Sequence, residues 1–253
     1  MGFEMIPSHA SHVKMNWKAL FLAGLITAFP LWANSTNPSA AAEDSLAPPD
    51  RQDVFAQGLA ELKKTEDAIQ AEPENLRLRF DRLRILFVLG VKDEKFIANG
   101  DREMEYLGTK LKGDSLHQVL LLGYQGAFRV VRAKHGFNLR RKWENLQSGI
   151  PLLDSAVKLK PEEAEIRYLR LVSNYYLPFF LGRKPIVRED FARLGKLLPD
   201  VAGEFPPKWY LSIAGFVMEK GKLKEPDRIA LADRMEEVAQ SSNGSAGNSG
   251  RSP

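Results

Sequence analysis

The chain has 253 residues, of which 44% are hydrophobic and 27% charged, values that are ordinary for a globular protein and sufficient for a sizeable core. Its formal charge of +4 is spread among neighbouring Lys, Arg, Asp and Glu residues, as on a solvated helix surface, so we expect no nucleic-acid partner. Because there is no cysteine, disulfides, thiolate metal sites and cysteine nucleophiles are excluded.

Residues 1–42 are predicted to be a signal peptide. Lys14 and Lys18 precede an apolar run, residues 19–29, and small residues follow it, which is the pattern that export machinery reads. The run is shorter than the roughly 20 residues that cross a bilayer. We therefore expect an exported, periplasmic protein, with membrane anchoring through an uncleaved N-terminal segment as the alternative.

Two cleavage positions fit this signal, one after Ala33 and one after Ala42. Translation from Met15 would give a compact signal of normal proportions, so Met15 is an alternative start. Residues 43–50 then form a flexible lead-in to the folded part of the chain.

Helical periodicity dominates residues 51–240, where apolar residues recur three and four positions apart. Glycine and proline residues separate these stripes and divide the region into about nine helices. The predicted helices are 51–71, 75–90, 93–111, 114–135, 139–160, 162–181, 186–199, 206–220 and 226–240. Short connections make consecutive helices antiparallel, so the predicted fold class is all-α, built from stacked helix hairpins. Residues 241–253 have no large apolar side chain, which predicts a disordered tail.

The helical region contains an internal repeat. The segment from Pro73 to Leu83 aligns with the segment from Pro161 to Leu171, with identical Pro, Glu, Arg, Arg and Leu positions. An alanine, Ala68 or Ala156, stands five residues before each proline. The two copies are 88 positions apart and enclose four predicted helices, so a hairpin averages 44 residues.

The segments around the two prolines resemble the tetratricopeptide repeat family, which places a small residue five positions before a proline that closes a hairpin. The residues after each proline follow the apolar stripe of the family's first helix, displaced by about one position: Phe80, Leu83, Phe87 and Tyr168, Leu171, Tyr175. Residues 133–182 also resemble exported bacterial proteins of this divergent repeat type. The resemblance implies a right-handed solenoid with a groove that binds a peptide or a partner's helix. Because the period exceeds the family's usual 34 residues, long-period repeats such as HEAT stay open.

Four arginines occupy equivalent repeat positions: Arg79, Arg82, Arg167 and Arg170. They either line this groove and hold a partner's carboxylates, for which Arg79, Arg167 and Arg170 are the candidates, or form structural pairs with nearby acids such as Asp81 and Glu165.

Five further groove candidates lie outside the repeated arginine positions: Tyr124, Arg129, Lys134, His135 and Tyr175. His135 stands before a glycine, so it fits either a functional histidine or the cationic end of a helix. Tyr175 begins an aromatic segment that fits either core packing or contact with a groove or a membrane surface.

No sequence signature of catalysis was found. The chain lacks a G-x-S-x-G elbow, a phosphate-binding glycine-rich loop and an H-E-x-x-H motif, so we expect no enzyme, no cofactor and no metal. The leading hypothesis is a non-catalytic scaffold that binds a protein or peptide in the periplasm or cell envelope, with at most peripheral membrane contact. The alternatives are a small-molecule binder with a pocket at Tyr124, His135 and Tyr168, an accessory subunit of an envelope transport complex and, ranked last, an unrecognised enzyme using paired carboxylates.

Overall fold

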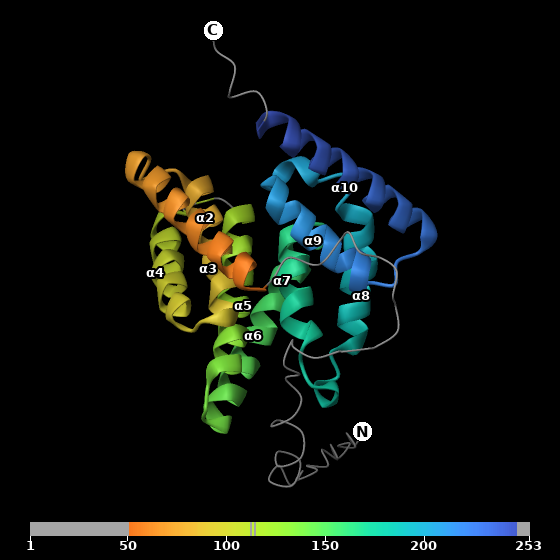
Figure 1. Ribbon diagram of the computed structural model, residues 1–253. Helices are drawn as coiled ribbons and strands as arrows, with labels where there is room; N and C mark the ends of the chain where they lie inside the picture. Colours follow the sequence, from red (N-terminus) through yellow and green to blue (C-terminus); the bar gives the residue numbers. More distant parts are fainter. Residues whose placement is uncertain (1–50, 112, 114, 247–253) are drawn as a thin grey trace, which may run out of the picture. The chain divides into compact units, whose positions relative to one another are not determined.

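The computed structural model of the chain describes residues 51–111, 113 and 115–246 (Figure 1). All of these residues belong to one compact unit. The expected signal peptide, its cleavage positions and the lead-in lie outside the described residues, as does the part of the tail beyond residue 246.

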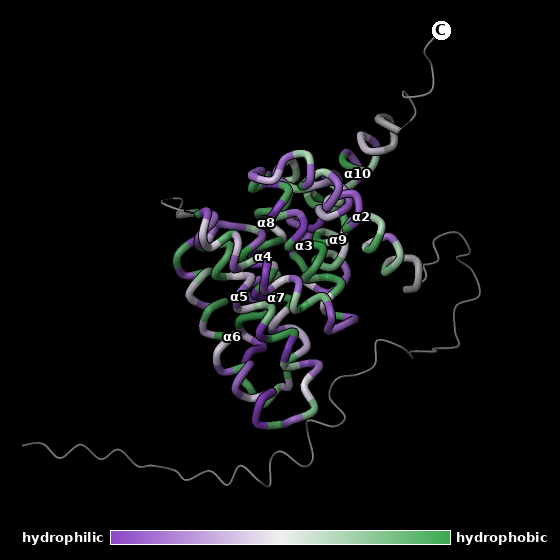
Figure 2. The backbone as a smooth tube through the Cα atoms, turned by 90° about the vertical axis from the view of Figure 1, so that its left-hand side faces the viewer, coloured by the Kyte–Doolittle hydropathy of each residue, from purple (hydrophilic) through white to green (hydrophobic). Residues whose placement is uncertain are grey.

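Nine α-helices and two short 3-10 helices form the described part, which contains no strand. They are α2 (Arg51–Ala71), α3 (Leu76–Lys92), α4 (Lys95–Lys110), α5 (Ser115–His135), α6 (Leu139–Leu159), α7 (Ala164–Tyr175), η1 (Phe179–Leu181), α8 (Lys184–Leu197), η2 (Ala202–Glu204), α9 (Pro207–Lys220) and α10 (Glu225–Ala246). Hydrophobic and hydrophilic stretches alternate along the helices, as Figure 2 shows. The predicted all-α fold class is confirmed.

Two helix ends differ from the prediction by more than two residues. The helix expected over 162–181 stops at Tyr175, because Pro178 has no backbone N–H to continue the hydrogen-bond ladder. The residues after it form η1, which ends at Gly182 in the left-handed region (φ 67°). The last helix continues to Ala246 instead of Gln240. The prediction ended it at Gln240 because large apolar residues stop there, but the backbone hydrogen bonds of a helix do not require apolar side chains.

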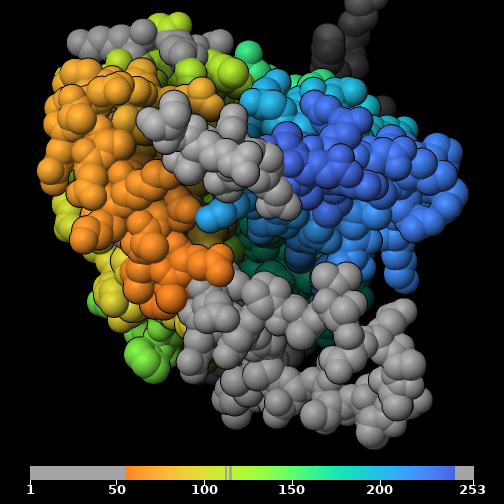
Figure 3. Space-filling model, turned by 45° about the horizontal axis from the view of Figure 1, so that its top comes forward, coloured from red at the N-terminus to blue at the C-terminus, as the bar shows by residue number. Residues whose placement is uncertain are grey.

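Consecutive helices pack against one another in chain order, as expected for stacked hairpins. Some helices also contact the next helix but one in the chain: α3 contacts α5, α5 contacts α7, and α8 contacts α10. At the surface, Lys208 of α9 reaches Glu61 of α2, with 3.1 Å between Nζ and Oε1. Figure 3 shows α2 and the α9–α10 pair on this same face.

The buried apolar residues form two clusters that meet at α7. The first cluster draws on α2 to α7 and includes Ile166 and Leu169. The second draws on α7 to α10 and includes Ala164 and Leu171. α7 therefore presents apolar residues to both clusters.

The internal repeat is present in the backbone. The amide of Glu72 donates to the Ala68 carbonyl, and the amide of Lys160 donates to the Ala156 carbonyl, at 3.0 Å in both cases. Each of these bonds precedes one of the two aligned prolines, and each proline opens the turn into the next helix, α3 or α7. The two prolines therefore begin equivalent elements.

Two glycines allow α5 and α6 to approach closely. A Cβ atom placed on Gly126 of α5 would lie 2.8 Å from the carbonyl oxygen of Gly149, and one placed on Gly149 of α6 would lie 2.8 Å from the carbonyl oxygen of Gly126. Since real Cβ atoms avoid such distances, side chains at these positions would separate the two backbones.

Candidate functional site

The first pair of repeat arginines is held by acids of the chain itself. Arg79 and Arg82 of α3 both bind Glu103 of α4, which is almost fully buried; for Arg79 the Nη1–Oε1 distance is 3.3 Å. Arg82 also binds Glu66 of α2 at 2.9 Å. Arg79 further donates from Nε to the Pro73 carbonyl at 3.1 Å. The cluster ties three consecutive helices together.

The second pair of repeat arginines is held in the same way. Arg167 and Arg170 of α7 bind Asp190 of α8 at 2.9 Å and 2.6 Å, and Asp190 is fully buried. Arg170 also lies 3.6 Å from Asp154 of α6. Although burial disfavours its charged form, the hydrogen bond to Asp190 raises the pKa of Arg170. Arg167 donates to the Pro161 carbonyl, as Arg79 does to that of Pro73.

These two clusters extend the internal repeat to residues that the sequence comparison did not include. Glu66 and Asp154 are 88 positions apart, like the arginines that they bind. The expected partners, Asp81 and Glu165, were wrong, because both of these acids pair with Arg84. The guanidinium groups of Arg167 and Arg170 are buried among acids of their own chain, so they do not line an open groove in this structure.

A third buried cluster joins the two copies of the repeat. Arg84 of α3 donates from Nε and Nη2 to the two carboxylate oxygens of Glu165 of α7, both at 2.7 Å. The hydroxyl of Tyr124 donates to the same carboxylate, and burial raises the pKa of this tyrosine well above its usual value. The repeat alignment places Val172 opposite Arg84, which explains why the comparison of the two copies gave no signal for this arginine.

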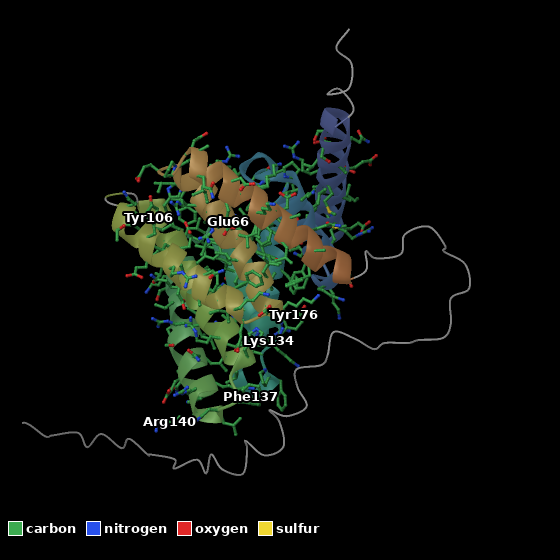
Figure 4. All side chains as sticks on the ribbon, turned by 60° about the vertical axis from the view of Figure 1, so that its left-hand side comes forward. Glu66, Tyr106, Lys134, Phe137, Arg140 and Tyr176 are labelled. Carbon is green, nitrogen blue, oxygen red and sulfur yellow. The ribbon has the colours of Figure 1, made fainter. Side chains whose placement is uncertain are left out.

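Two of the groove candidates, Lys134 and His135 at the end of α5, contact backbone carbonyls at the end of α3. Lys134, which Figure 4 labels, donates to the Val91 carbonyl at 2.6 Å. Nε2 of His135 lies 2.8 Å from the Gly90 carbonyl. Both carbonyls belong to the last turn of α3, where the helix itself provides no donors. Burial lowers the pKa of Lys134. Arg129, one turn earlier in α5, is half-buried.

Tyr124 and Tyr168, which we expected to flank a small-molecule pocket together with His135, pack with different groups of apolar residues. Tyr124 lies in the first apolar cluster, whereas Tyr168 packs against the second. Burial raises the pKa of Tyr168, as expected for a phenol in a packed interior. These tyrosines therefore serve core packing here.

Tyr175 lies beside a surface pocket at the start of α8. The pocket has a volume of about 440 Å³ and is lined by Asn174, Tyr175, Leu177, Pro178, Phe179, Arg183, Lys184, Val187 and Arg188. The ring of Tyr175 packs edge-on against Phe216 and Phe191, with centroid distances of 5.3 Å and 5.8 Å. It therefore forms a firm apolar wall.

The cations of this pocket differ in how firmly they are held. Arg183 donates to Asp154 at 2.5 Å and to the side-chain oxygen of Asn174 at 2.8 Å, so it is fixed in place. Lys184 and Arg188 are exposed and form no ion pair with another described residue. Both were missed from the sequence, since the stretch that contains them carries no motif and lies outside the aligned segments. Their charges are available to a ligand.

The described residues show neither a metal site nor a membrane-spanning helix. Within 51–111, 113 and 115–246, no three His, Asp or Glu side chains are grouped so as to hold a metal ion. Over the same residues, no helix combines the length and the apolar content needed to cross a bilayer.

Comparisons with known proteins give a distant structural likeness. No family model matches the chain, and no curated protein matches it. Among solved structures, it is similar to a thermophilic TPR protein of Thermus thermophilus, with a TM-score of 0.42 and 14% sequence identity. This similarity covers 75% of the present chain and 94% of the other chain.

Proposed function

We propose that this protein is a non-catalytic helical-repeat module of the bacterial periplasm or cell envelope that binds an acidic, apolar segment of another protein. The observation on which the proposal depends is the pocket at the start of α8, where apolar walls meet two cations that no described acid pairs. The predicted signal peptide supports the envelope location.

The lining of the pocket favours a ligand with both apolar and acidic groups. Tyr175, Leu177 and Val187 provide apolar surface, while Lys184 and Arg188 provide positive charge beside it. A peptide with an aromatic or aliphatic anchor and flanking carboxylates complements both features. Because the Tyr175 ring is packed against the second core, this wall requires no ordering when a ligand binds.

A small-molecule ligand is the second candidate, and the pocket volume favours it. About 440 Å³ falls within the range of roughly 300–1,000 Å³ that is typical of small-molecule sites. Such a ligand would need the same combination of an apolar body and an anionic group.

Selection from a random peptide library tests the proposal. The full chain is the bait, and we expect enriched peptides to place Asp or Glu beside Phe or Leu. Fluorescence anisotropy with an enriched peptide should show affinity at least about tenfold weaker for the double variant Lys184→Glu/Arg188→Glu, since two charges change sign at the site. The matched control, Lys63→Glu/Lys64→Glu, changes the same number of exposed charges on α2 and should bind like the wild type.

Two results would reject the pocket as the site. One is a library without acidic and apolar enrichment, and the other is equal loss of affinity in the two double variants. Binding of small carboxylates with an aromatic ring, in the absence of peptide binding, would favour the second candidate.

A further inference from the structure

We propose that one end of this molecule, formed by the α5–α6 turn and the segment between α7 and α8, docks on the surface of an anionic lipid bilayer. This proposal goes beyond peptide binding in the pocket: it has a different ligand, although Phe179, Lys184 and Arg188 line that pocket as well. It is based on exposed aromatic residues, on the charge around them and on the position of the two turns.

Both turns expose phenylalanine side chains to solvent. Phe137, between α5 and α6, has an exposed fraction of 101%, as large as that of an unfolded chain. Phe179 and Phe180 of η1 are 76% and 44% exposed. Leu139, at the first position of α6, is also exposed. Since soluble surfaces rarely gather large apolar groups at projecting turns, these residues indicate a contact surface.

Cations without an ion pair stand close in sequence to both groups of phenylalanines. Residues 115–143 contain six Lys and Arg residues and no Asp or Glu, although Arg132 pairs with Asp101 of α4. Residues 166–188 contain five Lys and Arg residues; Arg167, Arg170 and Arg183 pair with Asp190 or Asp154, which leaves Lys184 and Arg188 without an ion pair among the described residues. Near Phe137, Arg140 pairs with Glu144, whereas Arg141 and Lys142 form no ion pair with any described residue. Each turn therefore combines exposed aromatic rings with two cations that have no ion pair among the described residues, Arg141 and Lys142 at one turn and Lys184 and Arg188 at the other.

The two turns lie at the same end of the described part. Figure 1 shows the α5–α6 turn and the η1 segment at the lower end of the bundle, and Figure 4 shows Phe137 and Arg140 at that end in another orientation. Leu159 closes the opposite end of α6, about 30 Å away along a helix of this length. One planar surface is thus able to meet both turns.

An anionic bilayer fits this end better than a protein groove. Its headgroup layer presents diffuse negative charge to cations at several positions, and the acyl boundary below accepts aromatic rings from separate turns. A protein partner would need two apolar sockets with matching spacing. A lipid surface needs no such match, because it can accept the phenylalanines and cations of the two turns at any spacing.

Site-specific fluorescence provides the test. The chain has no cysteine, so Phe137→Cys, Phe179→Cys and Leu159→Cys each create a single position for an NBD label in the full chain. With vesicles of phosphatidylcholine and phosphatidylglycerol, we expect blue-shifted and stronger NBD emission at positions 137 and 179. The label at 159, a position that is also exposed (59%), should not change. Pure phosphatidylcholine vesicles should give little response at any position.

The N-terminal apolar run can itself enter vesicles, so all proteins in the test also carry Leu25→Asp/Ile26→Asp. In this background, Arg141→Glu/Lys142→Glu should weaken binding to the anionic vesicles at least about tenfold, because two of the cations near the surface change sign. Lys63→Glu/Lys64→Glu on α2 should bind like its parent. Equal NBD responses at 137 and 159, no response at 137 and 179, or equal loss in the two charge variants would overturn the proposal. Failure here leaves the peptide anisotropy result unaffected, so the two proposals are tested separately.

Discussion

Replacing Gly149 by alanine should force α5 and α6 apart where they cross. The new Cβ would lie 2.8 Å from the carbonyl oxygen of Gly126 and 3.0 Å from Cβ of Arg129, and neither atom belongs to the far end of a flexible side chain. Overpacking of this kind costs about 1–3 kcal/mol. The better helix propensity of alanine returns up to about 1 kcal/mol. We therefore expect a net loss of up to about 3 kcal/mol in the free energy of unfolding.

The same substitution at Gly215 is the control. Gly215 lies within α9, and a Cβ there would meet no atom within 4 Å, so Gly215→Ala should stabilise the protein by up to about 1 kcal/mol. For a domain of this size, each kcal/mol shifts Tm by roughly 2–4 °C. Thermal unfolding followed by circular dichroism should show a lower Tm for Gly149→Ala and a higher one for Gly215→Ala. Shifts in the same direction would refute the role assigned to the α5–α6 crossing.

Three further predictions concern buried polar groups. Asp190→Asn should cost about 3 kcal/mol in urea unfolding, because it removes the fully buried counter-charge of two buried arginines and leaves them only the more exposed Glu189 and Asp154. Glu189→Gln, at a 55% exposed side chain, should cost less than about 1 kcal/mol, and similar losses in the two variants would contradict the role of Asp190. Tyr124→Phe removes a hydrogen bond to a carboxylate and should cost about 1.5–3 kcal/mol. Tyr210→Phe removes a buried hydroxyl that has no partner among the described residues and should be close to neutral. Urea unfolding measures both losses, and a larger loss for Tyr210→Phe would contradict this expectation. Burial raises the pKa of Tyr210 to about 12, and that of Tyr168 is also raised, so the unfolded chain releases these protons from about pH 10 while the folded chain keeps them. Stability should therefore fall as the pH rises from about 10 to about 12; tyrosinate absorbance that appears well before helix loss would count against this.

Helical periodicity and turn residues were sufficient to predict the fold class and most helix positions. Apolar residues three and four apart fix a helix face whatever the tertiary context, and the alanine and proline of the repeat mark equivalent turns in the structure. The errors arose where local signals were weak. Pro178 ended α7 earlier than the pattern of aromatic residues indicated, because its missing N–H outweighs a continuing apolar stripe.

The sites were harder to predict because they depend on pairs of residues distant in sequence. The repeat identified Arg79 and Arg167, but their acids, Glu103 and Asp190, stand on the next helix, where sequence spacing gives no distance. Arg84 shows the same difficulty, since its partner Glu165 is 81 positions away.

The position of α7 between the two apolar clusters affects how the protein unfolds. Solenoids often unravel one unit at a time, because each unit touches only its neighbours. Here, loss of the C-terminal helices would expose Ala164 and Leu171 on the same helix that holds Ile166 and Leu169 in place for the N-terminal half. The described helices should therefore melt together, and a fragment cut on either side of α7 should not survive alone.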